Sequence, residues 1–154
     1  MLIGLISDTH GSLPPGVARV FRSCERILHA GDVGSIEVLR GLEDIAPVIA
    51  VAGNVDPPGL AAMLGEVARF EHGGASVIVA HTVQAALRAH AVQPGTVLVC
   101  GHTHVPVVER TDDVLLVNPG SPSRPRSPLG PTVGLLELAA QGPSARIVRL
   151  SRHL

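Results

Sequence analysis

The chain has 154 residues, of which 45% are hydrophobic and 16% are charged, and its formal net charge is −1. A chain of this length and composition is expected to fold as one globular domain over residues 1–154. The net charge of −1 gives no basic surface for a nucleic-acid backbone. The chain has no Trp, no Tyr and only two Phe, so it has no aromatic platform on which bases could stack. We therefore expect no bulk nucleic acid as a partner.

The first hundred residues alternate short apolar runs with amphipathic segments. Five runs lack period-two alternation, which is typical of strands buried on both faces of a sheet. Residues 14–23 carry an apolar stripe at helical spacing, and Ser35 can cap a second helix that ends before Pro47. This order of elements predicts an α/β fold. The five predicted strands cover residues 2–6, 26–30, 48–52, 77–80 and 97–100.

The remaining segments predict hairpins, short helices and one long loop. Residues 56–67 form a loop or a short helix, and residues 82–91 form a short helix. Residues 118–131 are rich in Pro, Ser and Arg and too long for a simple turn, so they form either an active-site loop or a flexible one. Three antiparallel hairpins are predicted, over residues 69–80 with a turn at Gly73-Gly74, over 107–109 with 114–117, and over 132–138 with 145–150.

Three further features narrow the chemistry and the compartment. The chain contains no Lys, which excludes a Walker-type phosphate loop and Schiff-base chemistry. Cys24 and Cys100 fit no CxxC pattern and are expected to be buried reduced thiols. No apolar run approaches the roughly 20 residues that cross a bilayer, and Asp8 interrupts the N-terminal run too early for a signal peptide. We therefore expect a cytoplasmic protein without a membrane partner, and the oligomeric state stays open.

Residue types that bind metals follow five predicted strands. Ligands bind beyond the carboxyl ends of the strands in open α/β sheets, so these side chains are expected to converge on one crevice. The set has oxygen and nitrogen donors but no thiolate, which suits two divalent ions better than one structural zinc. Two ions roughly 3.5–4 Å apart need a bridging carboxylate, and Asp32 is the candidate. The candidate ligands are Asp8, His10, Asp32, Asn54, His81, His102 and His104.

The motifs around these residues resemble those of the calcineurin-like metallophosphoesterase superfamily. They are Asp8-x-His10, Gly31-Asp32, Gly53-Asn54, His81 and Gly101-His102-x-His104, and GNVD, GHTHVP and NPGSPSRPR look closest to the small YfcE-type phosphodiesterases. The resemblance covers residues 1–126 and implies a four-layer α/β/β/α sandwich, with two mixed β-sheets face to face and helices outside. It also implies one ion held by Asp8, His10, Asp32 and His104, and another held by Asp32, Asn54, His81 and His102.

Such a site favours hydrolysis of a small phosphodiester by in-line attack of a metal-bridging hydroxide, without a covalent enzyme intermediate. The candidate catalytic residues are Asp32, Asn54 and His104. Manganese is the first choice for both ions, and iron, zinc, nickel and cobalt also fit this donor set. Because the chain lacks Lys, Arg124 and Arg126 are candidates for binding the phosphate, although both are equally compatible with solvated loop charges.

Residues beside the candidate ligands have two readings, and two motifs differ from the wider superfamily. His29 is a core histidine or supports a ligand, and Asp56 orients a ligand imidazole or shapes the turn before Pro57. Val55 stands where many members carry a His that resembles a proton donor, so another group must protonate the leaving group or the leaving group must be a good one. Thr82-Val83 stands where relatives often have Gly-His. His72, His90 and His153 receive no role.

Two other kinds of protein compete with the enzyme. One is a non-catalytic protein-binding scaffold on the same fold, like the retromer subunit that this fold resembles. The other is a protein that holds metal for stability without turnover. Loss of ligand positions would favour the scaffold, and none of the seven positions is lost here. The natural substrate is left open, because specificity lies in loops that carry no diagnostic residues.

Overall fold

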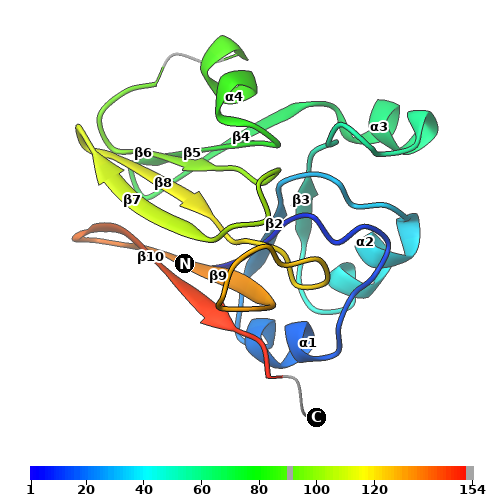
Figure 1. The fold of residues 1–154 in the computed structure, drawn as a ribbon. Coiled ribbons are helices and arrows are strands. Elements are labelled where there is room, and N and C mark those ends of the chain that lie inside the picture. Colours follow the sequence, from blue (N-terminus) through cyan, green and yellow to red (C-terminus); the bar gives the residue numbers. More distant parts are fainter. Residues whose placement is uncertain (90–91, 152–154) are drawn as a thin grey trace.

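The computed structural model describes residues 1–89 and 92–151, which form two mixed β-sheets packed face to face (Figure 1). In the first sheet, β1, β2 and β3 run parallel, and the antiparallel hairpin of β9 and β10 pairs with β1. The strand order is β10-β9-β1-β2-β3. The bounds are β1 Leu2–Ile6, β2 Arg26–His29, β3 Val48–Ala50, β9 Thr132–Ala139 and β10 Gly142–Arg149.

The second sheet has the order β4-β5-β6-β8-β7. Its central strands β5, β6 and β8 run parallel, while β4 and β7 pair antiparallel at its two edges. The bounds are β4 Val67–His72, β5 Ala75–Ala80, β6 Thr96–Val99, β7 Val107–Thr111 and β8 Val114–Asn118. Each sheet therefore contains three parallel strands, whose carboxyl ends can gather functional loops.

Four helices cover the outer faces of the sheets in the described part of the chain (Figure 1). Phe21 of α1 and Leu42 of α2 pack on the outer face of the first sheet, where α3 adds Leu60. Ala86 of α4 packs on the second sheet. The bounds are α1 Gly16–Phe21, α2 Ile36–Glu43, α3 Pro58–Leu64 and α4 Val83–Ala89. None of these helices has the length and apolar character that a membrane span requires.

The main core lies between the sheets, where side chains such as Leu5 and Val79 are fully buried. The layers therefore follow the order α/β/β/α, and this part of the prediction is confirmed. The predicted strands are also found, although the third ends at Ala50 and not at residue 52. Residues 58–64 are helical, and the hairpin turning at Gly73-Gly74 begins at Val67. The end of the predicted helix, with His90, and the tail, with His153, lie outside the described residues.

The two cysteines are free and buried, as predicted. Burial raises the pKa of the Cys24 thiol to about 11 and that of the Cys100 thiol to about 12. Both are therefore neutral thiols at physiological pH, and neither has the lowered pKa of a reactive cysteine.

Candidate metal centre

The loops that follow the parallel strands of both sheets meet at one place. They are joined by backbone hydrogen bonds, in which Asp8 N–H donates to the Gly31 carbonyl and His10 N–H donates to the Asp32 carbonyl, each at 3.0 Å. Two loops of the second sheet are joined in the same way, because Gly101 N–H donates to the His81 carbonyl at 3.0 Å, and the two sheets are connected where His102 N–H donates to Asp8 Oδ2 at 3.0 Å. The loop backbones therefore fix where the candidate ligands lie.

One group of side chains that could hold a cation consists of Asp8, His10 and His104. The Nε2 atoms of His10 and His104 are 3.3 Å apart, and His104 Nε2 lies 3.3 Å from Asp8 Oδ1. Asp8 and His104 are buried and His10 is partly buried. The three donor atoms converge within 4.8 Å of one another, which is compatible with one shared ion.

A second group consists of Asp8, Asp32 and His81. His81 Nε2 lies 3.2 Å from Asp32 Oδ2 and 3.9 Å from Asp8 Oδ1. His102 adjoins this group, since its Nδ1 atom is 3.3 Å from His81 Nε2. Asp8 thus contributes to both groups, whereas the resemblance placed it with one ion only.

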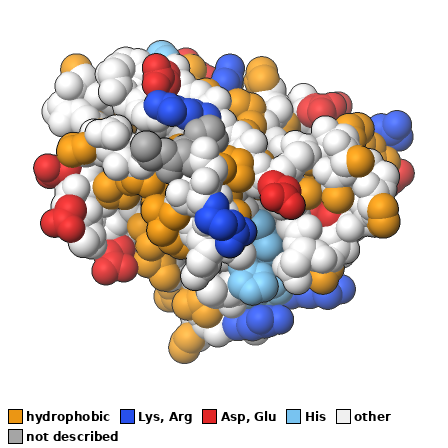
Figure 2. Space-filling model, turned by 90° about the horizontal axis from the view of Figure 1, so that it is seen from above, with side chains coloured by type: hydrophobic (Ala, Val, Ile, Leu, Met, Phe, Trp, Pro, Cys, Tyr) orange, Lys and Arg blue, Asp and Glu red, His pale blue; other side chains and the backbone are white. Residues whose placement is uncertain are grey.

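Asn54 and the surface around it complete the candidate site. Asn54 is exposed and lines a cavity of about 490 Å³ together with His81 and Thr82. Figure 2 shows histidine side chains gathered at one place on this face of the molecule, with basic side chains beside them. The candidate site therefore opens to solvent where a ligand can enter.

Hydrogen bonds fix which nitrogen of two imidazoles faces the site. His81 Nδ1 lies 2.8 Å from the Ala30 carbonyl, and His104 Nδ1 lies 2.6 Å from the Arg124 carbonyl. A carbonyl only accepts, so each Nδ1 carries the proton and each Nε2 presents a lone pair in the neutral ring. These lone pairs face carboxylate oxygens, so a positive charge is needed between them.

The two carboxylates are each held by one oxygen and leave the other for the site. Asp8 Oδ2 accepts hydrogen bonds from Ser7 Oγ at 2.8 Å and from His102 N–H at 3.0 Å, while Asp8 Oδ1 is buried and has no hydrogen-bond partner among the described residues. Asp32 Oδ1 accepts from Val55 N–H at 3.0 Å, and Asp32 Oδ2 faces both His10 and His81. A buried unpartnered carboxylate oxygen among imidazole lone pairs is a donor set that suits a cation.

The pKa shifts agree with a site that requires positive charge. Burial raises the pKa of Asp8, and burial lowers the pKa of His10, helped by the nearby Arg124 guanidinium. Burial acts against ionisation of Asp32 and of His81, but the hydrogen bond between the two, backbone hydrogen bonds and nearby charges together outweigh it, so the pKa of Asp32 is lowered and that of His81 is raised. The buried Asp8 carboxylate therefore attracts a positive charge, whereas Asp32 stays ionised beside His81.

The backbone at the candidate ligands is strained. Among the described non-glycine residues with positive φ, five are candidate ligands: Asp8 at 57°, His10 at 48°, Asp32 at 53°, His102 at 75° and His104 at 60°. The other two, Asp112 and Asp113, form the turn between β7 and β8, where positive φ is ordinary. Residues held in this region outside tight turns concentrate at functional sites.

Two glycines permit the close approach of the loops. A Cβ atom at Gly53 would overlap Asp32 Oδ1, and one at Gly101 would overlap Ser7 Oγ and lie against Asp8 Oδ2. Any larger residue at either position would displace a carboxylate of the candidate site. These glycines explain in physical terms why the motifs contain Gly before Asn54 and before His102.

The loop over residues 118–131 is part of the candidate site. Ser121 Oγ donates to the Asp8 carbonyl at 2.8 Å, and Ser123 Oγ donates to the Thr9 carbonyl at 2.7 Å. Arg126 N–H donates to the His104 carbonyl at 3.2 Å. Sequence reasoning gave no role to either serine, and the only available signal was small polar residues within an otherwise Pro-rich loop. The side chains of Arg124 and Arg126 are exposed.

His29 and Asp56 support the loops that carry the candidate ligands. His29 is fully buried, with Nε2 2.9 Å from Thr9 Oγ1 and Nδ1 accepting from Gly31 N–H at 3.2 Å. Burial lowers the pKa of His29 to about 3, so the ring is neutral. The two oxygens of Asp56 accept from the backbone N–H groups of Gly34 and Gly53, each at 2.8 Å. These contacts are those of a carboxylate that shapes turns.

The fold and the site together define a class of protein, an α/β sandwich with carboxylates and imidazoles gathered at its strand ends, as in metal-dependent phosphoesterases. The comparison with known families agrees, since the calcineurin-like phosphoesterase superfamily domain matches residues 1–141. This chain therefore belongs to the calcineurin-like phosphoesterase superfamily.

Individual relatives support the same assignment. A probable metallophosphoesterase of Methanothermobacter thermautotrophicus is 40% identical over 162 aligned residues, covering 97% of this chain and 92% of the relative. A phosphodiesterase of Methanocaldococcus jannaschii is 29% identical over 155 residues, covering 89% and 93%. The structure of YfcE, a phosphoesterase from E. coli, has a TM-score of 0.75 at 26% identity, covering 98% of this chain and 100% of that one.

The fold is also shared with proteins of another name. Vps29 from Entamoeba histolytica has a TM-score of 0.71 at 22% identity, covering 96% of this chain and 98% of that one. At this identity the likeness shows the common fold alone.

Proposed function

We propose that this protein hydrolyses small phosphodiesters with the help of two divalent cations. The observation that carries the proposal is the buried, unpartnered Oδ1 atom of Asp8, which lies 3.3 Å from His104 Nε2 and 3.9 Å from His81 Nε2. Hydrogen bonding alone does not satisfy these atoms when the rings are neutral, whereas a divalent cation does. The phosphodiesterase and phosphoesterase among the relatives support the reaction class.

The proposed ligands divide between the two ions. Asp8, His10, Asp32 and His104 would hold one, and Asp32, Asn54, His81 and His102 would hold the other. Asp32 Oδ2 faces the Nε2 atoms of His10 at 3.8 Å and of His81 at 3.2 Å, which supports its proposed bridging role. Bound cations would activate water for in-line attack and neutralise charge on the phosphate. Manganese fits this donor set first, and iron, zinc, nickel and cobalt also fit.

The chain's own residues have separate tasks in this proposal. Asp32, Asn54 and His104 would position the reacting groups, with His104 oriented by the Arg124 carbonyl. Arg124 and Arg126 would contact phosphate oxygens from the loop beside the centre. The backbone N–H of Val55 holds Asp32, but the Val55 side chain cannot give a proton to the leaving group. We therefore propose that the preferred substrates have leaving groups that need little protonation.

Hydrolysis of bis(p-nitrophenyl) phosphate tests the proposal. The metal-free protein is loaded with Mn²⁺, and activity is expected to require the metal, to disappear with a chelator and to disappear in Asp32→Asn. The exposed Asp44→Asn is the matched control and should retain activity. A folded protein that binds metal but hydrolyses no ester with any of the five metals would contradict the proposal. That outcome would favour the scaffold reading, in which the same surface binds another protein.

A further inference from the structure

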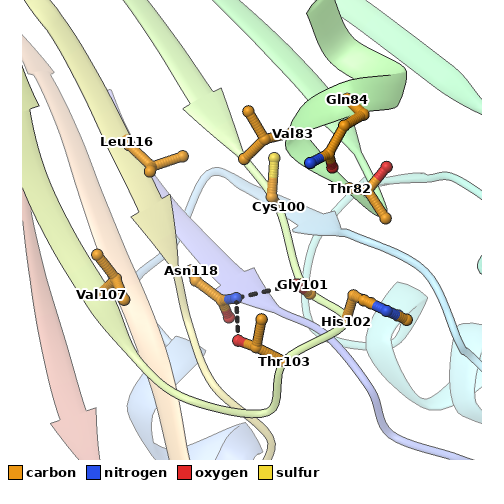
Figure 3. A pocket seen from close by; sticks show the side chains of 10 residues that line it. All are labelled: Thr82, Val83, Gln84, Cys100, Gly101, His102, Thr103, Val107, Leu116 and Asn118. Atoms are coloured by element: carbon orange, nitrogen blue, oxygen red, sulfur yellow. Dashed lines mark hydrogen bonds between the residues drawn. The ribbon is translucent and has the colours of Figure 1, made fainter.

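A second cavity, of about 260 Å³, adjoins the candidate metal centre at His102. It lies between the start of α4 and the strands β7 and β8, as the close view in Figure 3 shows. Val83 and Cys100 form one wall and Leu116 and Val107 another, and His102 lies at the end toward the metal centre. A group placed here would therefore be next to whatever the metal centre binds.

The cavity offers an apolar surface without charged carboxylate or guanidinium groups. Among the residues that the structure describes, its lining contains no Asp, Glu, Lys or Arg. Cys100 is a free and buried thiol. The Asn118 amide nitrogen already donates to the Gly101 carbonyl and to Thr103 Oγ1, each at 3.0 Å. The exposed Gln84 amide stands at the rim (Figure 3). The lining therefore suits an uncharged group with a largely apolar surface.

The cavity on the other side of the centre has a different character. It is larger, about 490 Å³, and its lining includes Glu66 and Arg88. Thr82 lines both cavities, so the two lie next to each other beside the candidate metal centre. A phosphodiester has two ester arms, and this arrangement provides two unlike spaces beside the phosphate position.

We propose that this cavity binds one ester arm of the substrate and selects an uncharged aromatic ring, so that aryl diesters are preferred to small alkyl diesters. The inference rests on the proposed function, since it assumes that a phosphodiester occupies the metal centre. The volume of 260 Å³ is below the roughly 300–1,000 Å³ of cavities that enclose whole ligands, which fits a space for a single arm.

Binding of two phosphinates to the zinc-loaded protein tests the proposal without turnover. Diphenylphosphinate and dimethylphosphinate carry the same anion and P–C bonds that cannot be hydrolysed as esters. Diphenylphosphinate is expected to bind about tenfold more tightly or better, because the ring buries apolar surface. In methyl NMR spectra it should shift the resonances of Val83, Val107 and Leu116, whereas dimethylphosphinate should leave them unchanged. Equal affinities, or shifts confined to Ala61 and Ala62 of the larger cavity, would overturn the proposal.

Variants locate the effect within the cavity. Val107→Phe fills the space from β7 and should remove most of the preference for the diphenyl compound. Val108→Phe is the matched control, because Val108 is the next residue of the same strand, is 42% exposed and does not line the cavity. Val83→Phe fills the space from the opposite wall and replaces Val107→Phe if that variant does not fold. Retention of the full preference in a folded filled variant would refute the proposal.

The two proposals fail in different ways. If the protein hydrolyses bis(p-nitrophenyl) phosphate but binds the two phosphinates equally, the cavity proposal is wrong and the proposed function stands. If it binds diphenylphosphinate preferentially but hydrolyses no ester, the proposed function is wrong and the cavity is still a site for an aryl-bearing anion.

Discussion

Replacing Asp8 by Asn should stabilise the metal-free protein and remove its response to metal. In the structure, Asp8 Oδ2 accepts two hydrogen bonds, while Oδ1 is buried without a hydrogen-bond partner and faces His104 Nε2 at 3.3 Å. An Asn side chain keeps the accepting oxygen on the Ser7 side and places an N–H donor toward the His104 lone pair. Asn also tolerates the positive φ of 57° at this position.

The size of the effect follows from the unsatisfied atom. A buried polar group without a partner costs about 1–3 kcal/mol, so Asp8→Asn should raise the free energy of unfolding of the metal-free protein by about that amount. For a chain of this length this corresponds to a rise in Tm of roughly 2–12 °C. Burial raises the pKa of Asp8, so the cost of the native carboxylate increases as the pH rises above its unfolded pKa. The gain from Asn should therefore be largest at neutral pH and disappear in acid.

Thermal unfolding with a chelator and with excess Mn²⁺ checks this prediction. With the chelator the variant should be the more stable protein; with Mn²⁺ the order should reverse, because binding at about 1,000 times Kd adds roughly 4.1 kcal/mol to the wild type only. Asp113→Asn is the control, since Asp113 also has positive φ but is exposed in a turn, and it should change stability by less than about 0.5 kcal/mol. A metal-free Asp8→Asn protein that is less stable than the wild type would refute the reasoning.

Three more predictions concern the loops around the centre. Gly53→Ala should weaken Mn²⁺ binding in calorimetry, because the added Cβ overlaps Asp32 Oδ1, while Gly59→Ala, where a Cβ meets nothing within 4 Å, should bind normally. Ser121→Ala should lower the free energy of unfolding in urea by about 1–3 kcal/mol, since it leaves buried backbone groups unpaired; an unchanged urea midpoint would argue against this. Burial lowers the pKa of His29 to about 3 in the folded protein. As the pH falls below about 6.5, this histidine becomes protonated in the unfolded chain but stays neutral in the folded one. The free energy of unfolding should therefore decrease by up to about 1.4 kcal/mol per pH unit. In His29→Asn this part of the acid sensitivity should be absent, and an identical pH profile would contradict the assignment.

The sheets were predictable because their strands are continuous apolar runs with few alternatives. Residues 2–6 and 97–99 lie in buried strands as expected. The segment around α3 was less predictable, because Pro57, Pro58 and Gly59 are typical both of a loop and of a helix start. The helix there has no fully buried side chain, so little apolar periodicity marks it.

The candidate ligands were visible in the sequence because each follows a strand, and their spacing fixes the edge of the sheet where they lie. The contacts that hold them were not visible. Ser121 bonds to the Asp8 carbonyl across 113 positions of the chain, and nothing local to the loop indicates that partner. For Asp56 the sequence allowed two roles, orienting an imidazole or shaping the turn before Pro57, and its oxygens accept from the N–H groups of Gly34 and Gly53. Any residue can offer its backbone carbonyl or N–H group, so the sequence does not reveal which residue such a side chain bonds to.

The strained backbone of the candidate ligands is the property that was hardest to predict from the sequence. Positive φ is ordinarily marked by glycine, but five candidate ligands adopt it with aspartate or histidine side chains. Strain of about 1–3 kcal/mol at each position would add up to an amount comparable with the whole stability of a domain. Backbone hydrogen bonds between the loops and the bonds from Ser121, Ser123 and Asp56 hold them in place. The candidate ligands and the side chains that support their loops are thus largely different residues, and only the candidate ligands follow from a motif.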